Sequence, residues 1–172
     1  AAPTVLNCSG VAHLGPAMND TSLRAAVAAW LTEARRVAVC RYGDIATWDT
    51  HLVTDMSELF KDKTQFNADI SRWNTSSVTT MEQMFYSADA FNQPLSRWDV
   101  SSVTNMAYMF YDADAFNKDI LGWDTSRVGD SGYIFYSATA WHARFEGGGS
   151  STLPDRGWTR SCLLYTSDAA DE

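Results

Sequence analysis

Carboxylate and amide side chains recur every 25 residues along the middle of the chain, at Asp49, Asn74, Asp99 and Asp124. Two of them are preceded by arginines, Arg72 and Arg97. Oppositely charged groups in register would form a polar recognition strip, and neighbouring carboxylates have the chemistry to hold a cation. The alternative is that each carboxylate bonds its own backbone at a corner, which would make the strip a solvated face. The sequence leaves both interpretations open.

Tyrosines recur with the same period, at Tyr86, Tyr111 and Tyr136. Tyrosine supplies a large contact area at a low cost in conformational entropy, and it is common on binding faces. The three residues are therefore a second candidate binding surface. A half-buried rim over helical turns is an equally good interpretation of the pattern.

No group of residues has the spacing of a catalytic site. The histidines, His13, His51 and His142, are far apart in sequence, and His51 occupies a corner position of the repeat. The "GGGS" stretch lacks the lysine and the flanking elements of a phosphate-binding loop. We therefore expect a protein that is not an enzyme, with no catalytic residue, no metal site and no cofactor.

A 25-residue repeat positions both candidate surfaces. Apolar residues recur in six columns with this period. The columns are Trp48, Trp73, Trp98 and Trp123; Val53, Val78, Val103 and Val128; Phe60, Phe85, Phe110 and Phe135; Phe66, Phe91, Phe116 and Trp141; Ile70, Leu95 and Ile120; and Met56, Met81 and Met106. A unit of this size cannot close a core alone, so the repeats must stack and the columns must form one continuous core.

The apolar spacing changes within each repeat. The stretch "SRWDV" alternates, which favours a short strand, and "SSVTNMAYMF" steps by three and four residues, which favours a helical turn. The predicted fold class is therefore a leucine-rich-repeat-like solenoid of about four coils over residues 44–145. Each coil is expected to contain short parallel strands and one short helix.

The pattern "FNxxLSxWDVSSVTNMxxMFxxAxxFN" resembles the tandem 25-residue unit of BspA-like leucine-rich-repeat surface proteins, the mycoplasma-type surface lipoproteins. The resemblance spans roughly residues 42–141, and its columns match in consecutive repeats. It implies a leucine-rich-repeat-like solenoid that is exposed on a cell surface or secreted. It carries over no catalytic residue, because the family has none to offer.

An amphipathic stretch precedes the repeats, over residues 20–43. Leu23, Val27 and Trp30 lie at helical spacing, which predicts an N-terminal capping helix that seals the first coil. Residues 1–19 are expected to be an irregular leader segment. Cys8 and Cys40 would pair in an oxidising compartment, or they would remain two separate thiols.

The sequence after the repeats changes character. Residues 146–161 have the Gly, Ser and Pro composition of a linker. Residues 162–172 coincide with what a sequencing adaptor encodes, so we expect an artefact there, with a native acidic tail as the alternative. The ragged last repeat favours a longer array in the complete protein.

Charge and composition limit the partners. The net charge of −8 argues against nucleic acid, and no stretch has the length of a membrane span. We expect a non-enzymatic, adhesion-like module that binds a protein or glycan outside the cell or at its surface. The alternatives are a structural spacer or matrix protein and, on the strength of a short threonine ladder, an ice- or mineral-binding protein.

Overall fold

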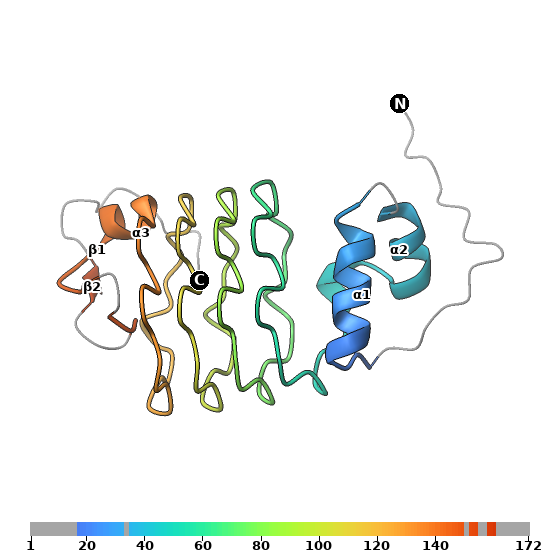
Figure 1. Ribbon diagram of the computed structural model, residues 1–172, viewed down its shortest axis with the longest axis horizontal. Coiled ribbons are helices and arrows are strands. Elements are labelled where there is room, and N and C mark those ends of the chain that lie inside the picture. Colours follow the sequence, from blue (N-terminus) through green and yellow to red (C-terminus); the bar gives the residue numbers. More distant parts are fainter. Residues whose placement is uncertain (1–16, 33–34, 150–151, 155–157, 161–172) are drawn as a thin grey trace.

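The computed structural model describes residues 17–32, 35–149, 152–154 and 158–160. The repeats stand side by side in a row, with two helices at one end and a helix and a strand pair at the other (Figure 1). The elements are α1 (Asp20–Trp30), α2 (Arg35–Tyr42), a 3-10 turn (Ile45–Thr47), α3 (Thr139–Arg144), β1 (Phe145–Glu146) and β2 (Thr159–Arg160). The two strands pair antiparallel. Within these described ranges, no helix has the length and apolar composition needed to cross a bilayer.

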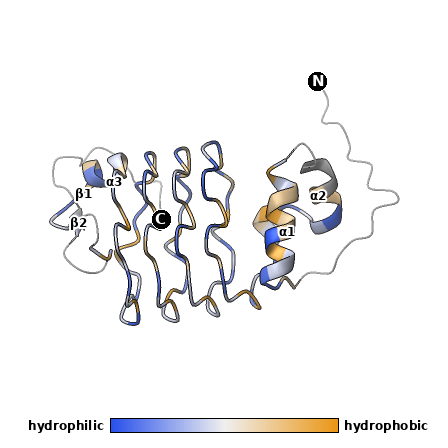
Figure 2. Ribbon diagram, in the orientation of Figure 1, coloured by the Kyte–Doolittle hydropathy of each residue, from blue (hydrophilic) through white to orange (hydrophobic). Residues whose placement is uncertain are grey.

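Helix α1 begins at a well-formed cap. The Asn19 side chain accepts a hydrogen bond from the Ser22 backbone, and the Ser22 hydroxyl accepts one from the Asn19 backbone, each at 2.9 Å. This reciprocal pair satisfies two N–H groups that a helix start otherwise leaves unpaired. The helix carries both hydrophobic and hydrophilic residues (Figure 2). The predicted apolar stripe of Leu23, Val27 and Trp30 is buried, together with Ala26.

The segment 20–43 contains two helices where the sequence predicted one. Helix α1 ends at Trp30, and α2 packs beside it. Cys40 in α2 is buried and disulfide-bonded. The other two cysteines of the chain, Cys8 and Cys162, lie outside the described residues. So do residues 1–16 of the expected leader and the whole of the suspected adaptor segment, 162–172.

The predicted fold class, a leucine-rich-repeat-like solenoid with strands and a helix in each coil, is wrong. From residue 48 to residue 138 the structure contains no helix and no strand. It consists of turns and extended segments, joined by isolated parallel bridges of a single residue pair. These bridges are Asp55 with Thr80, Thr80 with Asn105, and Asn105 with Asp130. The periodicity of the apolar residues is real, but it reflects successive turns.

The hydrogen bonds explain why neither regular element forms. In the first repeat, the N–H groups of Met56, Glu58, Phe60 and Asp62 donate to carbonyls of the next repeat at 2.8–3.1 Å. The residues between them donate locally, for example Lys61 to Glu58 at 3.2 Å. Donors therefore alternate between the neighbouring repeat and their own turn. A helix needs every donor to bond four residues back, and this pattern never does so.

The alternation coincides with left-handed residues in every repeat. Each repeat has two non-glycine residues with φ between +50° and +58°, four positions apart. They are Glu58 and Asp62, Gln83 and Ser87, Tyr108 and Asp112, and Tyr133 and Ser137. A residue with positive φ breaks both a helix and a strand. The sequence does not announce this geometry, because none of these positions is a glycine.

The predicted apolar columns are confirmed as the core, except that Val128 is only partly buried. Phe60, Phe85, Phe110 and Phe135 stack on one another, with ring centroids 5.4–5.7 Å apart. The second aromatic column runs beside the first and ends with Trp141, which stacks on Phe116 and Phe135. All these rings are buried. Stacked aromatic rings in register bury a large apolar area, which is the main force that holds the repeats together.

Tryptophans and asparagines tie one repeat to the next. The indole N–H of Trp98 donates to the Ile70 carbonyl in the preceding repeat at 3.2 Å, and Trp73 and Trp123 repeat the bond. The Asn67 side chain accepts a hydrogen bond from the Asn92 backbone at 3.0 Å. The bond joins two neighbouring repeats through an exposed asparagine.

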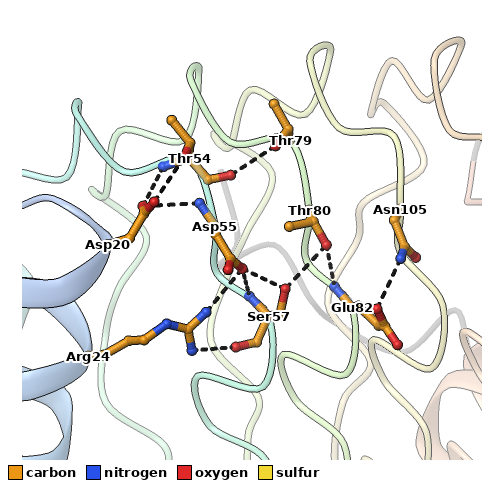
Figure 3. A network of polar contacts seen from close by, with 9 residues as sticks. All are labelled: Asp20, Arg24, Thr54, Asp55, Ser57, Thr79, Thr80, Glu82 and Asn105. Atoms are coloured by element: carbon orange, nitrogen blue, oxygen red, sulfur yellow. Dashed lines mark hydrogen bonds and ion pairs between the residues drawn. The ribbon is translucent and has the colours of Figure 1, made fainter.

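Helix α1 seals the first repeat with a polar network (Figure 3). The carboxylate of Asp20 accepts hydrogen bonds from the backbone and hydroxyl of Thr54 and from the backbone of Asp55. Arg24 pairs with the Asp55 carboxylate at 3.0 Å and donates to the Ser57 carbonyl at 2.7 Å. The predicted capping role of this segment therefore has a specific basis in hydrogen bonds.

The last repeat is covered by apolar residues of the C-terminal elements. Trp141 of α3 is fully buried and packs against Phe145 of β1 and against Trp158. Residues 146–161, predicted to be a linker, therefore include a buried tryptophan. The stack is thus covered at both of its ends.

Candidate functional site

The structure places the repeated carboxylates at corners, where each holds its own turn. The Asp99 carboxylate accepts from the backbone and hydroxyl of Ser101, at 3.0 and 2.6 Å. Asn74 makes the same two bonds with Ser76. Asp124 accepts from the Ser126 backbone, and Asp49 from His51. This is the interpretation in which the corner residues bond their own backbone.

Hydrogen bonds also set the ionisation of the corner carboxylates. The hydroxyl and backbone of Ser101 hold the pKa of Asp99 below its usual value, although the charge of Asp124 in the next repeat opposes this. Ser126 lowers the pKa of Asp124 in the same way, with a smaller contribution from Arg127. Both carboxylates are therefore ionised at neutral pH, and hydrogen bonds within its own turn stabilise the charge of each one.

The arginines lie exposed beside these corners. Arg72 contributes to lowering the pKa of Asp69, after the hydrogen bonds from Ser71. Among the described residues, no ion pair joins Arg72 or Arg97 to a corner carboxylate. Five of the predicted binding residues are thus exposed: Arg72, Asn74, Arg97, Asp99 and Asp124.

The predicted tyrosines form a ladder of stacked rings. Tyr86 and Tyr111 lie 4.6 Å apart between centroids with an interplanar angle of 2°, and Tyr111 and Tyr136 lie 4.9 Å apart at 15°. Tyr86 and Tyr111 are half-buried, and Tyr136 is 43% exposed. These exposures fit both interpretations of the sequence. Tyr86 and Tyr111 are partly covered, as in a half-buried rim, whereas Tyr136 is exposed, as a binding residue would be.

Two further tyrosines join this ladder, and the sequence analysis missed them. Tyr108 stacks on Tyr133 at 5.4 Å, and it also contacts Tyr111 at 6.0 Å. Tyr133 is 48% exposed and meets Tyr136 edge-on at 5.8 Å. The signal was present, because Tyr108 and Tyr133 share the 25-residue period and precede two predicted tyrosines by three positions. We call these five residues the tyrosine face: Tyr86, Tyr108, Tyr111, Tyr133 and Tyr136.

The backbone beneath the tyrosine face is unusual. Tyr108 and Tyr133 both have left-handed φ values, of 57° and 56°. A bulky side chain is rare in this region, where glycine, asparagine and aspartate are favoured. Glu58 and Gln83 hold the same positions in earlier repeats and also have positive φ. The fold therefore requires the left-handed conformation at this position, but it does not require a tyrosine.

Charged groups surround the tyrosine face unevenly. The ammonium of Lys61 lies over the ring of Tyr86, 5.4 Å from its centroid. Asp112 directly follows Tyr111, and its backbone N–H donates to the Tyr136 carbonyl in the next repeat at 2.9 Å. Partial desolvation raises the pKa of the Tyr111 hydroxyl, and the neighbouring phenols and Asp112 raise it further.

Other polar ladders of the repeat are internally satisfied. The hydroxyls of Thr79 and Thr104 each donate to the carbonyl of the threonine one repeat earlier, at 3.1 Å. The protons of these hydroxyls are therefore used within the stack. Within the part of the chain that the structure describes, no three His, Cys, Asp or Glu side chains gather as a metal site.

The repeats match a known protein family. The protein family described as "Mycoplasma protein of unknown function, DUF285" matches residues 26–147. This range begins within α1 and ends just beyond β1, so it contains the corner strip and the whole tyrosine face. No curated protein and no solved structure matches the chain.

Proposed function

The chain belongs to this family of Mycoplasma proteins of unknown function, and from its geometry we propose that it is a non-enzymatic interaction module. Its tyrosine face binds a protein ligand, and the stack of repeats is the rigid support that presents this surface. The observation that carries the proposal is the continuous ladder of five tyrosines across three repeats.

The composition of the tyrosine face supports a protein ligand. Tyrosine is enriched in protein interfaces because its ring has few rotatable bonds and its hydroxyl can bond a partner. Stacking fixes these rings before any ligand arrives, so little side-chain entropy remains to be lost on binding. Most ring faces are covered by their neighbours, and the surface therefore offers ring edges and hydroxyls, which suit the mixed polar and apolar surface of a protein.

The rest of the molecule supports a passive role. The threonine and corner ladders use their polar groups within the stack, and the aromatic columns are sealed at both ends. A scaffold of this kind changes little on binding, which favours recognition by a preformed surface. The corner strip remains a second, predicted contact region within the same proposal.

We place this module outside the cell or at its surface. Its repeat pattern resembles that of BspA-like surface proteins, and we propose that relationship at the level of the sequence columns alone. The disulfide at Cys40 supports the location, because disulfides persist mainly in oxidising compartments.

An array of extracellular proteins and surface glycans, probed with the purified chain, tests this proposal. We expect binding to one or more proteins that falls when Tyr133 and Tyr136 are both replaced by leucine, which keeps apolar bulk. The matched control is Arg97→Ala with Asp99→Ala in the corner strip. A glycan ligand, or a protein ligand that responds only to the corner variant, would contradict the assignment. Absence of any ligand would favour the structural spacer.

A further inference from the structure

One corner of the stack carries a different residue from the others. Asp49, Asp99 and Asp124 stand at this position in their repeats, whereas the second repeat has Asn74. The turn is the same, because the side-chain carbonyl of Asn74 accepts hydrogen bonds from the backbone and hydroxyl of Ser76, at 3.1 and 2.8 Å. An aspartate serves this turn equally well in the other repeats. The turn alone therefore does not explain the asparagine.

The asparagine has one group that an aspartate lacks, its amide nitrogen. The turn uses Oδ1 of Asn74, and its Nδ2 makes no hydrogen bond to any residue that the structure describes. Asn105 differs, because its Nδ2 donates to the Glu82 carboxylate at 3.1 Å. The amide nitrogen of Asn74 is thus available for covalent modification.

The fold turns this side chain toward solvent. Trp73 and Thr75, on either side of Asn74, are only 3% and 1% exposed, whereas Asn74 and Ser76 are exposed. The Thr50 hydroxyl of the first repeat donates to the Asn74 backbone carbonyl at 2.9 Å and fixes the corner. A group attached to Nδ2 would therefore extend into solvent without displacing the core.

Residues 74–76 form the acceptor triplet for N-linked glycosylation, which is Asn, any residue except proline, and then Ser or Thr. Such sites lie on the surface of secreted proteins. The disulfide at Cys40 fits the same compartment, where disulfides persist. Two more triplets begin at Asn7, outside the described residues, and at Asn19, in the cap of α1. Asn74 alone belongs to a corner that recurs in other repeats, so its surroundings can be compared.

We propose that Asn74 is the attachment site of an N-linked glycan. The donor is an oligosaccharide carried on a lipid diphosphate. Nδ2 forms a bond to the anomeric carbon of the first sugar, the bond from that carbon to the phosphate oxygen breaks, and the lipid diphosphate leaves while Nδ2 loses one proton. This inference rests on the proposed location outside the cell. It goes beyond the proposed function, because the glycan would cover the second corner and keep it from contact with a protein ligand.

Secretion of the full chain from a eukaryotic host, followed by mass spectrometry of its peptides, tests the proposal. We expect the peptide that contains Asn74 to carry a glycan, which a peptide-N-glycosidase releases to leave an aspartate. Asn74→Gln and Ser76→Ala should each abolish this glycan, and Ser76→Ala does so while it keeps the asparagine. An unmodified Asn74 in the secreted chain, or a glycan that persists in Ser76→Ala, would overturn the proposal.

Two variants at equivalent corners serve as matched controls. Asp124→Asn creates the triplet of the second repeat, again between two buried side chains, Trp123 and Thr125. We expect this variant to gain a glycan at position 124. Asp49→Asn should gain none, because His51 stands where the triplet needs a hydroxyl. The reverse pattern would show that the corner geometry does not accommodate a glycan. Thermal unfolding of each secreted variant checks that it is folded.

The outcome also distinguishes this inference from the proposed function. If Asn74 carries no glycan while a protein ligand still depends on Tyr136, the glycan site is wrong and the tyrosine face stands. If Asn74 is glycosylated and no ligand responds to the tyrosines, the glycan site stands and the proposed function fails.

Discussion

Asp20 accepts hydrogen bonds from both the backbone N–H and the hydroxyl of Thr54, at 2.7 and 2.9 Å. In the following repeats, Thr79 and Thr104 donate the same two groups to a carbonyl of the preceding repeat. Thr54 has no preceding repeat. The carboxylate of Asp20 therefore takes the place of the backbone carbonyl that a preceding repeat would supply. Helix α1 caps the stack through these hydrogen bonds.

Replacing Asp20 by alanine should destabilise the protein by about 2–3 kcal/mol. The change removes bonds to a charged group, each worth roughly 1.5–3 kcal/mol at most, and leaves donors of Thr54 and Asp55 to partial solvation. Urea unfolding measures the effect. Asp89→Ala is the control, since Asp89 is exposed and only its backbone carbonyl bonds within the stack. A loss below about 0.5 kcal/mol in Asp20→Ala would contradict the capping role.

The same cap should depend on pH. Burial raises the pKa of Asp20, but the hydrogen bonds from Thr54 and Asp55 outweigh burial and leave the pKa below its usual 3.8. The folded state thus binds fewer protons, and its extra stability is complete above pH 3.8 and is lost as the pH falls through the lower folded pKa. The stability advantage of the wild type over Asp20→Asn should therefore shrink between neutral pH and strongly acidic pH. A constant difference across that range would show that ionised Asp20 contributes nothing.

Val100 should tolerate replacement by threonine, which a buried valine ordinarily does not. Thr50 and Thr75 occupy the equivalent buried position, and their hydroxyls donate to Asn74 and Asp99 carbonyls at 2.9 and 2.8 Å. A hydroxyl at position 100 would meet the Asp124 carbonyl in the same geometry. We expect Val100→Thr to be neutral or to stabilise by about 0.5–1.5 kcal/mol in urea unfolding.

The reverse change, Thr75→Val, is the matched comparison. It removes an existing bond and should cost about 1 kcal/mol. If Val100→Thr instead destabilised the protein by about 1 kcal/mol or more, the normal cost of burying an unpaired hydroxyl, the threonine column would not be equivalent between repeats.

Ser87 tests the left-handed positions. Its φ is 50°, and its N–H donates to Tyr111 in the next repeat at 2.8 Å. Glycine adopts this conformation freely, so Ser87→Gly should lie within about 1 kcal/mol of the wild type, with strain relief offsetting the entropy of glycine. Ser87→Val should lose about 1–3 kcal/mol, because a branched side chain is most strained there. Thermal unfolding of the pair gives the comparison, and equal melting temperatures would contradict the assigned backbone geometry.

The sequence predicted the period and the core but not the backbone. Columns such as the Trp98 and Phe110 positions could be found because burial demands an apolar residue in every repeat. The turns could not, because positive φ at Glu58 or Tyr108 is imposed by stacking and is not signalled by glycine. Spacing of three and four residues fits a helix and a chain of turns equally well, and only the hydrogen bonds distinguish them.

The candidate site could also be predicted from the sequence only in part. Tyr86, Tyr111 and Tyr136 were predicted as a set from their period alone, and their ring stacking follows from the repeat. The corner role of Asp99 was one of two interpretations, and the Ser101 contacts favour it. Tyr108 and Tyr133 were missed although they share the period, because the earlier repeats hold Glu58 and Gln83 at this position and the column is therefore not tyrosine throughout.

The most direct test of the account compares Tyr136→Leu with Asp99→Asn for binding to a protein ligand found on the array. Both residues are exposed, so neither change should disturb the core. The account predicts that Tyr136→Leu weakens binding by about tenfold or more, as expected for an interface anchor, and that Asp99→Asn leaves it within about twofold. The opposite ranking would move the binding surface to the corners and contradict the account.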